Sequence, residues 1–243
     1  MNLYYFFGWL LTGLYAHGWH RTRYYGRRHL PKGKAYLIVC NHQSFIDPNV
    51  VGFGLYRAIG FMARASLFKG FLGWWFPRVY CFPVERASSD RASLRVAVDI
   101  LKGGRPLIVF PEGTRSRDGQ LQPFKRGFQL IARQAGVPIL PAAIHGSGRA
   151  FPKGARFPKP LKVRVSYGEP VSLEELAEIG AEGVRARVQG LMDEMDERFG
   201  VAPVRAVGEA PHGDPDGESQ RDPGGGPDAG PEAGPDGGGS TPG

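Results

Sequence analysis

Cysteine is scarce in this chain of 243 residues, which contains only Cys40 and Cys81. Two cysteines make no disulfide framework of the kind that holds small secreted domains together, and the clustered Cys and His residues of a structural zinc site are missing. The sequence therefore predicts no metal site. The cysteine content fits a protein of a reducing compartment.

Long apolar runs are missing as well. The uncharged stretch at residues 3–16 falls short of the about 20 apolar residues that a membrane-spanning helix needs. Trp19 and several basic residues follow it, whereas a cleavable signal peptide has its positive charges before the apolar run. We therefore expect residues 1–28 to form a membrane-associating helical segment, with aromatic rings at headgroup depth and arginines on anionic phosphates. A buried core helix is the alternative.

Large apolar side chains are absent from residues 208–243, a segment with 12 Gly and 7 Pro but no Ile, Leu, Phe, Tyr, Trp or Met. A segment that cannot bury apolar surface cannot offset its chain entropy, so we expect a disordered tail. Its eight acidic residues and the single Arg221 give it a charge of −7.

The rest of the chain is strongly basic. Because the whole chain carries +8 and the tail −7, residues 1–207 carry +15. Such a body favours an anionic partner, for which an acidic membrane surface, a phosphorylated substrate, an acyl carrier and nucleic acid are candidates. Nucleic acid is set aside, because the 31 Lys and Arg residues form no long run and no recognised binding motif.

Short apolar runs that end in polar or turn residues predict buried strands, here at residues 35–40, 106–110, 137–144 and 162–167. Helical patterns lie between and after them, at residues 89–101, 125–135 and 172–199. This alternation indicates an α/β fold with a mainly parallel sheet flanked by helices. Ligands bind beyond the carboxyl ends of the strands in such folds, so polar residues at these ends are candidates for a site.

His42 and Asp47 directly follow the first predicted strand. Side chains five positions apart diverge on a regular helix but can meet in a turn, which Pro48 favours because it disfavours helical geometry at the preceding residue. An imidazole held through one nitrogen by a carboxylate is a general base tuned near neutral pH. By itself the pair is also compatible with a capping histidine and a turn aspartate.

A basic loop follows the second predicted strand, at residues 110–119. Its Arg115 and Arg117 supply planar donors that suit phosphate or carboxylate oxygens. Arg86 and Lys125 add positive charge near other junctions. A solvated surface position is the alternative for each of them.

Four blocks in this order resemble the 1-acylglycerol-3-phosphate acyltransferases, a family of glycerolipid acyltransferases. They are Asn41–Asp47, Phe82–Arg86, Phe110–Ser116 and Val137–Pro141, and a Phe-Lys-x-Gly stretch at residues 124–127 accompanies them. The resemblance covers about residues 30–170. It implies the α/β fold of that family for an acyltransferase domain at residues 29–207.

The resemblance implies a role for each matching residue. His42 would deprotonate the acceptor hydroxyl and Asp47 would orient His42, with no acyl-enzyme. The phosphate of the acceptor would be held by the second and third blocks and the following stretch, through Arg86, Glu112, Gly113, Thr114, Arg115 and Lys125. The fourth block would line the acyl-donor site, with Val137, Pro138, Ile139 and Pro141.

The implied reaction moves a fatty acyl chain from acyl-CoA or acyl carrier protein to the 2-hydroxyl of lysophosphatidic acid, giving phosphatidic acid in phospholipid biosynthesis. No cofactor is expected, since the thioester already supplies the leaving group. The same chemistry on another lysophospholipid or lyso-lipid acceptor is the nearest alternative. A non-catalytic membrane-surface protein is the alternative from a different class.

Basic residues after the apolar stretch favour the cytoplasmic face of the cell membrane, so we expect a peripheral or monotopic protein there. A serine hydrolase is disfavoured, because the sequence has no Gly-x-Ser-x-Gly motif and Ser44 is only two residues from His42.

Overall fold

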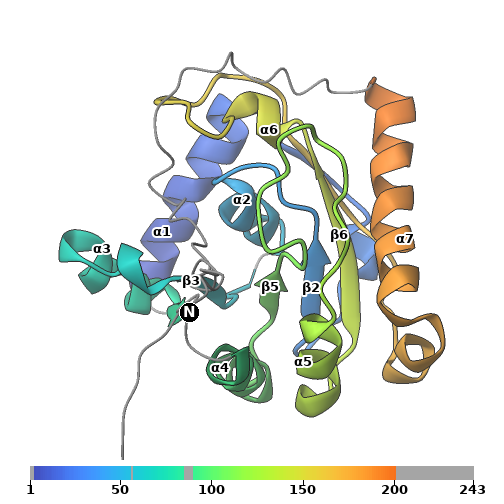
Figure 1. Cartoon of the computed structure of the whole chain (residues 1–243). Helices are drawn as coiled ribbons and strands as arrows, with labels where there is room; N and C mark the ends of the chain where they lie inside the picture. The colour runs from blue at the N-terminus through green and yellow to red at the C-terminus, as the bar shows by residue number, and fades with distance from the viewer. Residues whose placement is uncertain (1–2, 56, 85–89, 201–243) are drawn as a thin grey trace, which may run out of the picture. The chain divides into compact units, whose positions relative to one another are not determined.

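The computed structural model of the protein describes residues 3–55, 57–84 and 90–200 (Figure 1). Arg86, Ser89 and the acidic tail at residues 208–243, on which the sequence makes predictions, lie outside the described residues.

A five-stranded sheet forms the centre of the fold. Its strand order is β1-β7-β6-β2-β5, and each neighbouring pair is parallel except β6 and β7, which are antiparallel. The strands are β1 (Arg23–Tyr25), β2 (Leu37–Cys40), β5 (Leu107–Val109), β6 (Ile139–His145) and β7 (Arg164–Tyr167). Because β2 lies between β5 and β6, the polar sequence that follows it is held over the middle of the sheet edge.

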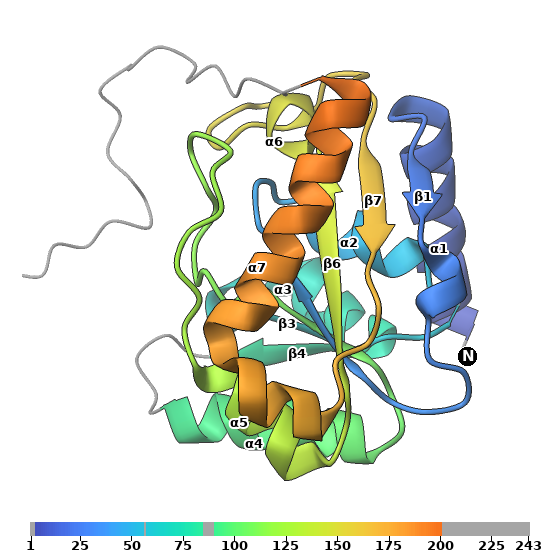
Figure 2. The ribbon, with the colours of Figure 1, turned by 90° about the vertical axis from the view of Figure 1, so that its right-hand side faces the viewer.

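Helices cover both faces of this sheet, and Figure 2 shows the longest of them, α7, across one face. That face packs against α4 (Asp90–Lys102), α5 (Gly127–Ala135) and α7 (Leu173–Phe199). The other face packs against α2 (Asp47–Phe53). Successive residues of β2 are fully buried on alternate faces, as a strand inside a parallel sheet requires.

A second sheet has two parallel strands, β3 (Phe61–Arg64) and β4 (Cys81–Val84). Short helices connect them: η3 (Ala65–Leu67), α3 (Gly70–Trp75) and η4 (Phe76–Val79). The N-terminal helix α1 (Leu3–Gly13) contacts this connection through Tyr4, whose ring meets Trp74 edge-on with centroids 5.7 Å apart. It contacts α2 through Trp9, which stacks on Phe53 at 4.8 Å.

Three short elements complete the described fold. The helix η1 (Leu14–Trp19) continues α1, η2 (Arg27–His29) follows β1, and α6 (Ser147–Ala150) follows β6.

The predicted α/β class is confirmed, as are the four predicted strands, which are β2, β5, β6 and β7. The helices α4, α5 and α7 lie where the patterns predict them. Gly136 ends α5 in the left-handed conformation (φ 69°), and Ser172 caps α7 by accepting from the backbone N–H of Glu175 at 3.2 Å.

Two predictions need correction. Residues 23–25, placed by the sequence inside a helical segment at residues 1–28, form strand β1 and pair with β7. The sequence could not predict this strand, because three residues are too few to show the alternation of a strand and the partner strand β7 lies far along the chain. The predicted helix at residues 172–199 is not continuous, because Gly180 has non-helical backbone angles (φ 61°, ψ −160°).

The helix α1 is exposed along most of its length, so the alternative of a buried core helix is wrong. Within α1 only Tyr5 and Gly13 are buried. Large apolar side chains before Tyr5 and between Tyr5 and Gly13 are exposed. Leu3 is 66% exposed and Leu11 is 61% exposed. Among the described residues, no helix combines the length and the apolar character that crossing a bilayer requires.

Candidate active site

Asn41 fixes the place where the chain leaves β2. Its Nδ2 donates to the carbonyl of Ile144 at 3.0 Å, and its Oδ1 accepts from the backbone N–H of Ile144 at 2.8 Å. Both bonds are buried, so they are strong constraints on the backbone. The carboxyl ends of β2 and β6 are therefore tied together, and His42 stands at the sheet edge.

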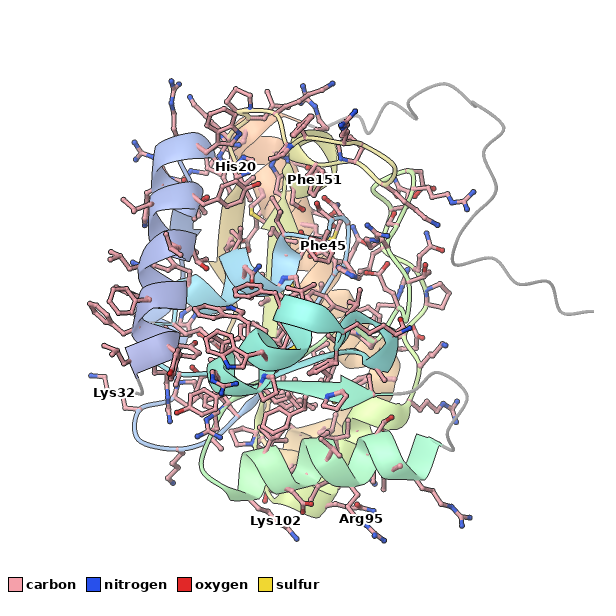
Figure 3. The ribbon with its side chains drawn as sticks, turned by 90° about the vertical axis from the view of Figure 1, so that its left-hand side faces the viewer. His20, Lys32, Phe45, Arg95, Lys102 and Phe151 are labelled. Carbon is pink, nitrogen blue, oxygen red and sulfur yellow. The ribbon has the colours of Figure 1, made fainter. Side chains whose placement is uncertain are left out.

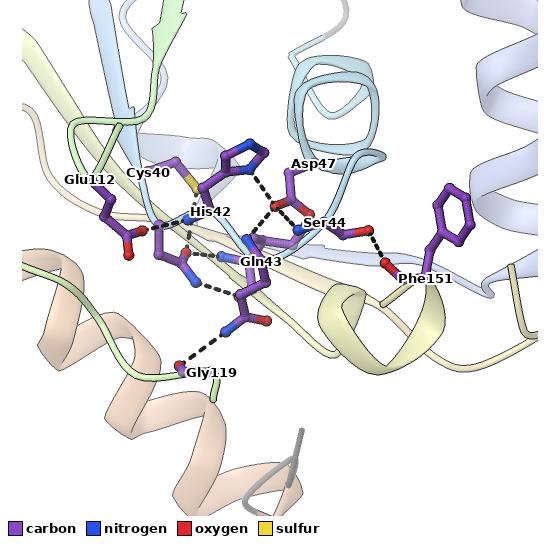
Figure 4. Close-up of polar contacts among 10 residues, drawn as sticks. Cys40, His42, Gln43, Ser44, Asp47, Glu112, Gly119 and Phe151 are labelled. Atoms are coloured by element: carbon purple, nitrogen blue, oxygen red, sulfur yellow. Dashed lines mark hydrogen bonds and ion pairs between the residues drawn. The ribbon is translucent and has the colours of Figure 1, made fainter. Parts of the chain in front are cut away.

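His42 and Asp47 meet in the turn that follows. His42 Nδ1 lies 2.9 Å from Asp47 Oδ2 (Figure 4). The same oxygen accepts from the backbone N–H groups of Gln43 and Ser44, each at 2.7 Å. Since a carboxylate accepts, Nδ1 carries the proton, which leaves the lone pair of the imidazole on Nε2.

Asp47 opens α2, and Pro48 fits the first turn of that helix because no intrahelical N–H is lost there. The Asp47 side chain is completely buried, whereas 19% of the His42 side chain is exposed. The pair is thus a fixed carboxylate behind a partly accessible imidazole. This geometry allows His42 Nε2 to take a proton from a bound hydroxyl.

Glu112 supports this turn from the neighbouring loop. Its Oε1 accepts from the backbone N–H of His42 at 2.6 Å, and its Oε2 accepts from the backbone N–H of Gln122 at 3.0 Å. Burial raises the pKa of the Glu112 carboxyl, and these two backbone hydrogen bonds oppose the rise. The ring of Phe110 stacks on the imidazole of His42 at 4.2 Å. Glu112 therefore positions His42 through the main chain.

The loop after β5 brings Glu112, Gly113 and Lys125, three of the predicted phosphate-binding residues, close together. Gly113 has the left-handed conformation (φ 74°), and a Cβ at this position would lie 2.9 Å from Lys125 Nζ. The ammonium of Lys125 thus lies against the Gly113 backbone, one residue from Glu112. Thr114 is exposed and Arg115 half-buried. In the described residues, neither Arg115 nor Lys125 pairs with a carboxylate, so both cations remain available for an anionic ligand.

The fourth predicted block is not brought to His42. Ile139 pairs with Leu37 at the start of β2, whereas His42 follows the end of β2. The backbone N–H of Leu37 donates to the carbonyl of Pro138 at 3.0 Å, and Val137 and Ile139 are buried in the core against α5 and α7. Pro141 is paired with Val39 in mid-strand. These residues therefore pack the sheet, away from the candidate base.

An apolar cavity of about 750 Å³ lies beside the turn instead. Phe45, Pro48 and Asn49 line it from the turn and the first residues of α2. The rest of its wall comes mainly from α1, β3, α3 and η4, with single residues from η3 and β4 and two more from the end of α2. Sequence reasoning missed this cavity, because its wall is assembled from segments that lie far apart in the chain.

Within the described residues, no group of three or more His, Cys, Asp or Glu side chains could hold a metal ion. The site as a whole consists of the candidate base His42, the buried carboxylate of Asp47, the cations of Arg115 and Lys125, and an apolar cavity.

Comparison with known proteins agrees with this geometry. The family model described as "Acyltransferase" matches residues 21–145. The chain belongs to the acyltransferase family. The match covers all four predicted blocks and ends with β6, so it includes the whole turn around His42 and Asp47.

Individual relatives are 1-acylglycerol-3-phosphate acyltransferases, which confirms the resemblance predicted from the four blocks. The 1-acyl-sn-glycerol-3-phosphate acyltransferase of Bacillus subtilis is 28% identical over 189 residues, covering 72% of this chain and 90% of the relative. A mouse relative, 1-acyl-sn-glycerol-3-phosphate acyltransferase alpha, is 33% identical, covering 69% of this chain and 60% of the relative.

The crystal structure of the 1-acyl-sn-glycerophosphate (LPA) acyltransferase from Thermotoga maritima matches with a TM-score of 0.63 and 30% identity, covering 81% of this chain and 78% of that one. Some relatives are much longer, since the chain spans only 43% of a chloroplastic relative from Brassica napus.

Proposed function

We propose that this acyltransferase moves a fatty acyl chain from acyl-CoA or acyl carrier protein to the 2-hydroxyl of 1-acylglycerol-3-phosphate, giving phosphatidic acid. The observation that carries the proposal is the hydrogen bond between His42 Nδ1 and the buried Asp47, which leaves Nε2 as an acceptor. The named activities of the relatives from Bacillus subtilis and Thermotoga maritima support the choice of acceptor.

In the proposed mechanism, His42 Nε2 takes the proton of the 2-hydroxyl while its oxygen attacks the thioester carbonyl. The new C–O ester bond forms and the C–S bond breaks, and the proton on His42 passes to the departing thiolate. Asp47 stabilises the imidazolium that exists between these two transfers. No cofactor takes part, because the thioester provides the leaving group.

Arg115 and Lys125 are proposed to hold the phosphate of the acceptor, with Gly113 and Thr114 in the same loop. Their lack of carboxylate partners in the described residues supports this role, as does the position of the Lys125 ammonium against Gly113. Arg86 remains a further candidate from its place in the second sequence block.

The apolar cavity is proposed to take an acyl chain. Its lining is mostly aliphatic and aromatic, and its volume of about 750 Å³ is in the range of pockets that bury small-molecule ligands. Because Phe45 and Pro48 line it, a chain inside it lies next to the turn that carries the base.

We also propose that the protein is peripheral on the cytoplasmic face of the cell membrane. The exposed apolar side chains of α1 support an interfacial position, and the arginines that follow them support that side of the bilayer.

Release of free thiol by the purified protein tests the reaction, with long-chain acyl-CoA or acyl carrier protein as donor and lysophosphatidic acid as acceptor. We expect acceptor-dependent release that His42→Ala lowers by about 10² to 10⁴ or more. His17→Ala is the matched control, since His17 is exposed on η1. Acceptor-independent release, or full activity of folded His42→Ala, would refute the proposal.

A further inference from the structure

The segment that joins α6 to β7 carries a concentrated positive charge. Residues 149–162 contain five basic and no acidic side chains. All five basic side chains are exposed: Arg149, Lys153, Arg156, Lys159 and Lys162. Over the described part of the chain, Arg156 and Lys159 form no ion pair with a carboxylate. A dense cluster of cations of this kind attracts a surface with many negative charges.

The same segment also exposes an aromatic ring. Phe157 is 72% exposed, more than any other large apolar side chain in the described residues. Next to it in the chain, the carbonyl of Pro158 accepts from the indole N–H of Trp19 at 3.4 Å, and Trp19 is itself 48% exposed. Exposed aromatic rings among arginines and lysines are typical of the headgroup region of a bilayer.

Hydrogen bonds fix this segment on the fold. The backbone N–H of Lys159 donates to the carbonyl of Ala150 at 2.7 Å and closes the loop. His20 is fully buried; its Nδ1 lies 3.1 Å from the carbonyl of Leu161, and its own carbonyl accepts from Val163 at 3.2 Å. The charged loop is therefore attached to the end of the N-terminal helices.

A further bond attaches the segment to the candidate active site. Ser44 Oγ donates to the carbonyl of Phe151 at 2.7 Å, and the backbone N–H of Ser44 donates to Asp47. One residue thus contacts both the charged loop and the carboxylate that orients His42. Displacing the loop would displace the turn.

We infer that residues 149–162, together with Trp19, form a second membrane-contact site that binds the anionic phosphate headgroups of a bilayer and sets the depth at which the His42 turn meets the membrane. Figure 3 shows His20, Phe151 and Phe45 on the side of the molecule that carries α1. The bond from Trp19 to Pro158 joins this loop to the end of η1, the helix that continues α1. This inference rests on surface features and does not depend on acyl transfer.

An acidic protein such as an acyl carrier is the other anion that this loop could meet. The bilayer is favoured because Phe157 and Trp19 are exposed beside the cations, and because the exposed apolar face of α1 adjoins them. An acidic protein surface would satisfy the cations but leave this apolar area in water.

Flotation of the full chain with vesicles tests the inference, using phosphatidylcholine with and without phosphatidylglycerol. The variant Arg156→Glu/Lys159→Glu should weaken binding to the anionic vesicles by at least about tenfold and leave binding to pure phosphatidylcholine nearly unchanged. Raised salt should reduce the difference between variant and wild type. Phe157→Ser should weaken binding to both vesicle types.

Matched control variants distinguish an effect specific to this loop from a general effect of changed net charge or of lost apolar surface. Arg95→Glu/Lys102→Glu makes the same charge change on α4, and Figure 3 shows these two residues at the opposite end of the molecule from Phe151. Leu130→Ser removes an exposed apolar side chain of α5. Circular dichroism checks folding, and activity on a water-soluble short-chain acceptor should stay at the wild-type level in every variant.

Equal losses of anionic-vesicle binding in the loop variant and the α4 control would overturn the inference. So would unchanged vesicle binding combined with loss of activity on acyl carrier protein but not on acyl-CoA, because the loop would then bind the donor. If no variant or wild-type protein transfers acyl groups, the flotation result still decides the membrane-contact site by itself.

Discussion

The backbone N–H of His42 donates to Glu112 Oε1 at 2.6 Å, so a side chain 70 residues away fixes the main chain of the candidate base. Glu112→Ala should leave two partly buried N–H groups, those of His42 and Gln122, without their acceptor, which destabilises by at most about 1–3 kcal/mol for each group. Glu112→Gln keeps one carbonyl oxygen. We expect urea unfolding to rank the proteins wild type, Glu112→Gln, Glu112→Ala, and kcat to fall in the same order with KM little changed. An unaltered kcat in folded Glu112→Ala would show that this bond does not position the base.

Asp47→Asn tests the orientation of the imidazole. An amide can keep an oxygen acceptor for the N–H groups of Gln43 and Ser44 but has no negative charge to stabilise an imidazolium. We expect kcat to fall by about 10² to 10⁴ while acceptor KM changes little, as measured by thiol release. Asp118→Asn serves as the control, because Asp118 is an exposed carboxylate whose bonds to described residues lie within its own loop. Similar losses in both variants would argue against a specific role for Asp47.

The paired variant Arg115→Ala/Lys125→Ala tests the phosphate site. Loss of charge-assisted hydrogen bonds should raise the KM of the acceptor by about tenfold to a hundredfold, with a smaller effect on the KM of the acyl donor. Arg133→Ala on α5 removes an exposed cation from another surface and should leave both constants unchanged. A rise confined to the donor would assign the loop to the donor instead.

Acid should weaken the fold through buried histidines. Burial lowers the pKa of His145 below its ordinary value of 6.5, although Asp196 opposes the shift, and burial also lowers the pKa of His20. Arg149 and Arg164 face His145 and add to the lowering. The unfolded chain therefore binds more protons than the folded chain below about pH 6.5, and the free energy of unfolding falls as pH decreases from there.

His145→Gln keeps a donor for the carbonyl of Gly200, which lies 3.2 Å from His145 Nε2, and removes the titration. We expect this variant to lose less stability than wild type between about pH 7 and about pH 5, by up to roughly 1.4 kcal/mol per pH unit. Urea unfolding at both pH values measures the difference. An acid response equal to that of wild type would exclude His145 as its source, and His17→Gln, at an exposed position, is the control.

The sequence predicted the elements whose signal is local. Strand β2 is a short apolar run followed by polar residues, and the Ser172 cap and the Gly136 stop mark their helix ends directly. The contact between His42 and Asp47 was also predictable, since Pro48 favours the turn in which they meet.

Other features depend on contacts between distant parts of the chain and had no local signal. Strand β1 exists because β7 pairs with it, and the cavity exists because α1 packs near α3. The distance of the fourth block from His42 could not be predicted either. It is fixed by the register between β6 and β2, which no local pattern in the sequence encodes. The hydrogen bond between the backbone N–H of His42 and Glu112 could not be predicted, because it forms only when the loop after β5 folds against the turn after β2.

The cavity adjoins the turn of the candidate base, but different elements hold the base and form most of the cavity wall. Asn41, Glu112 and Ser44 fasten the turn of His42 to β6 and to two loops, whereas most of the cavity wall comes from α1, β3, α3 and η4. Acyl-chain selectivity and turnover should therefore be separable traits. Gly8 offers a first position for such engineering, because a Cβ there would meet Trp75 and Val79 at 3.4 Å without a backbone clash. If the cavity takes the acyl chain as proposed, substitutions along α1 should change the chain-length preference and leave the turn around His42 in place.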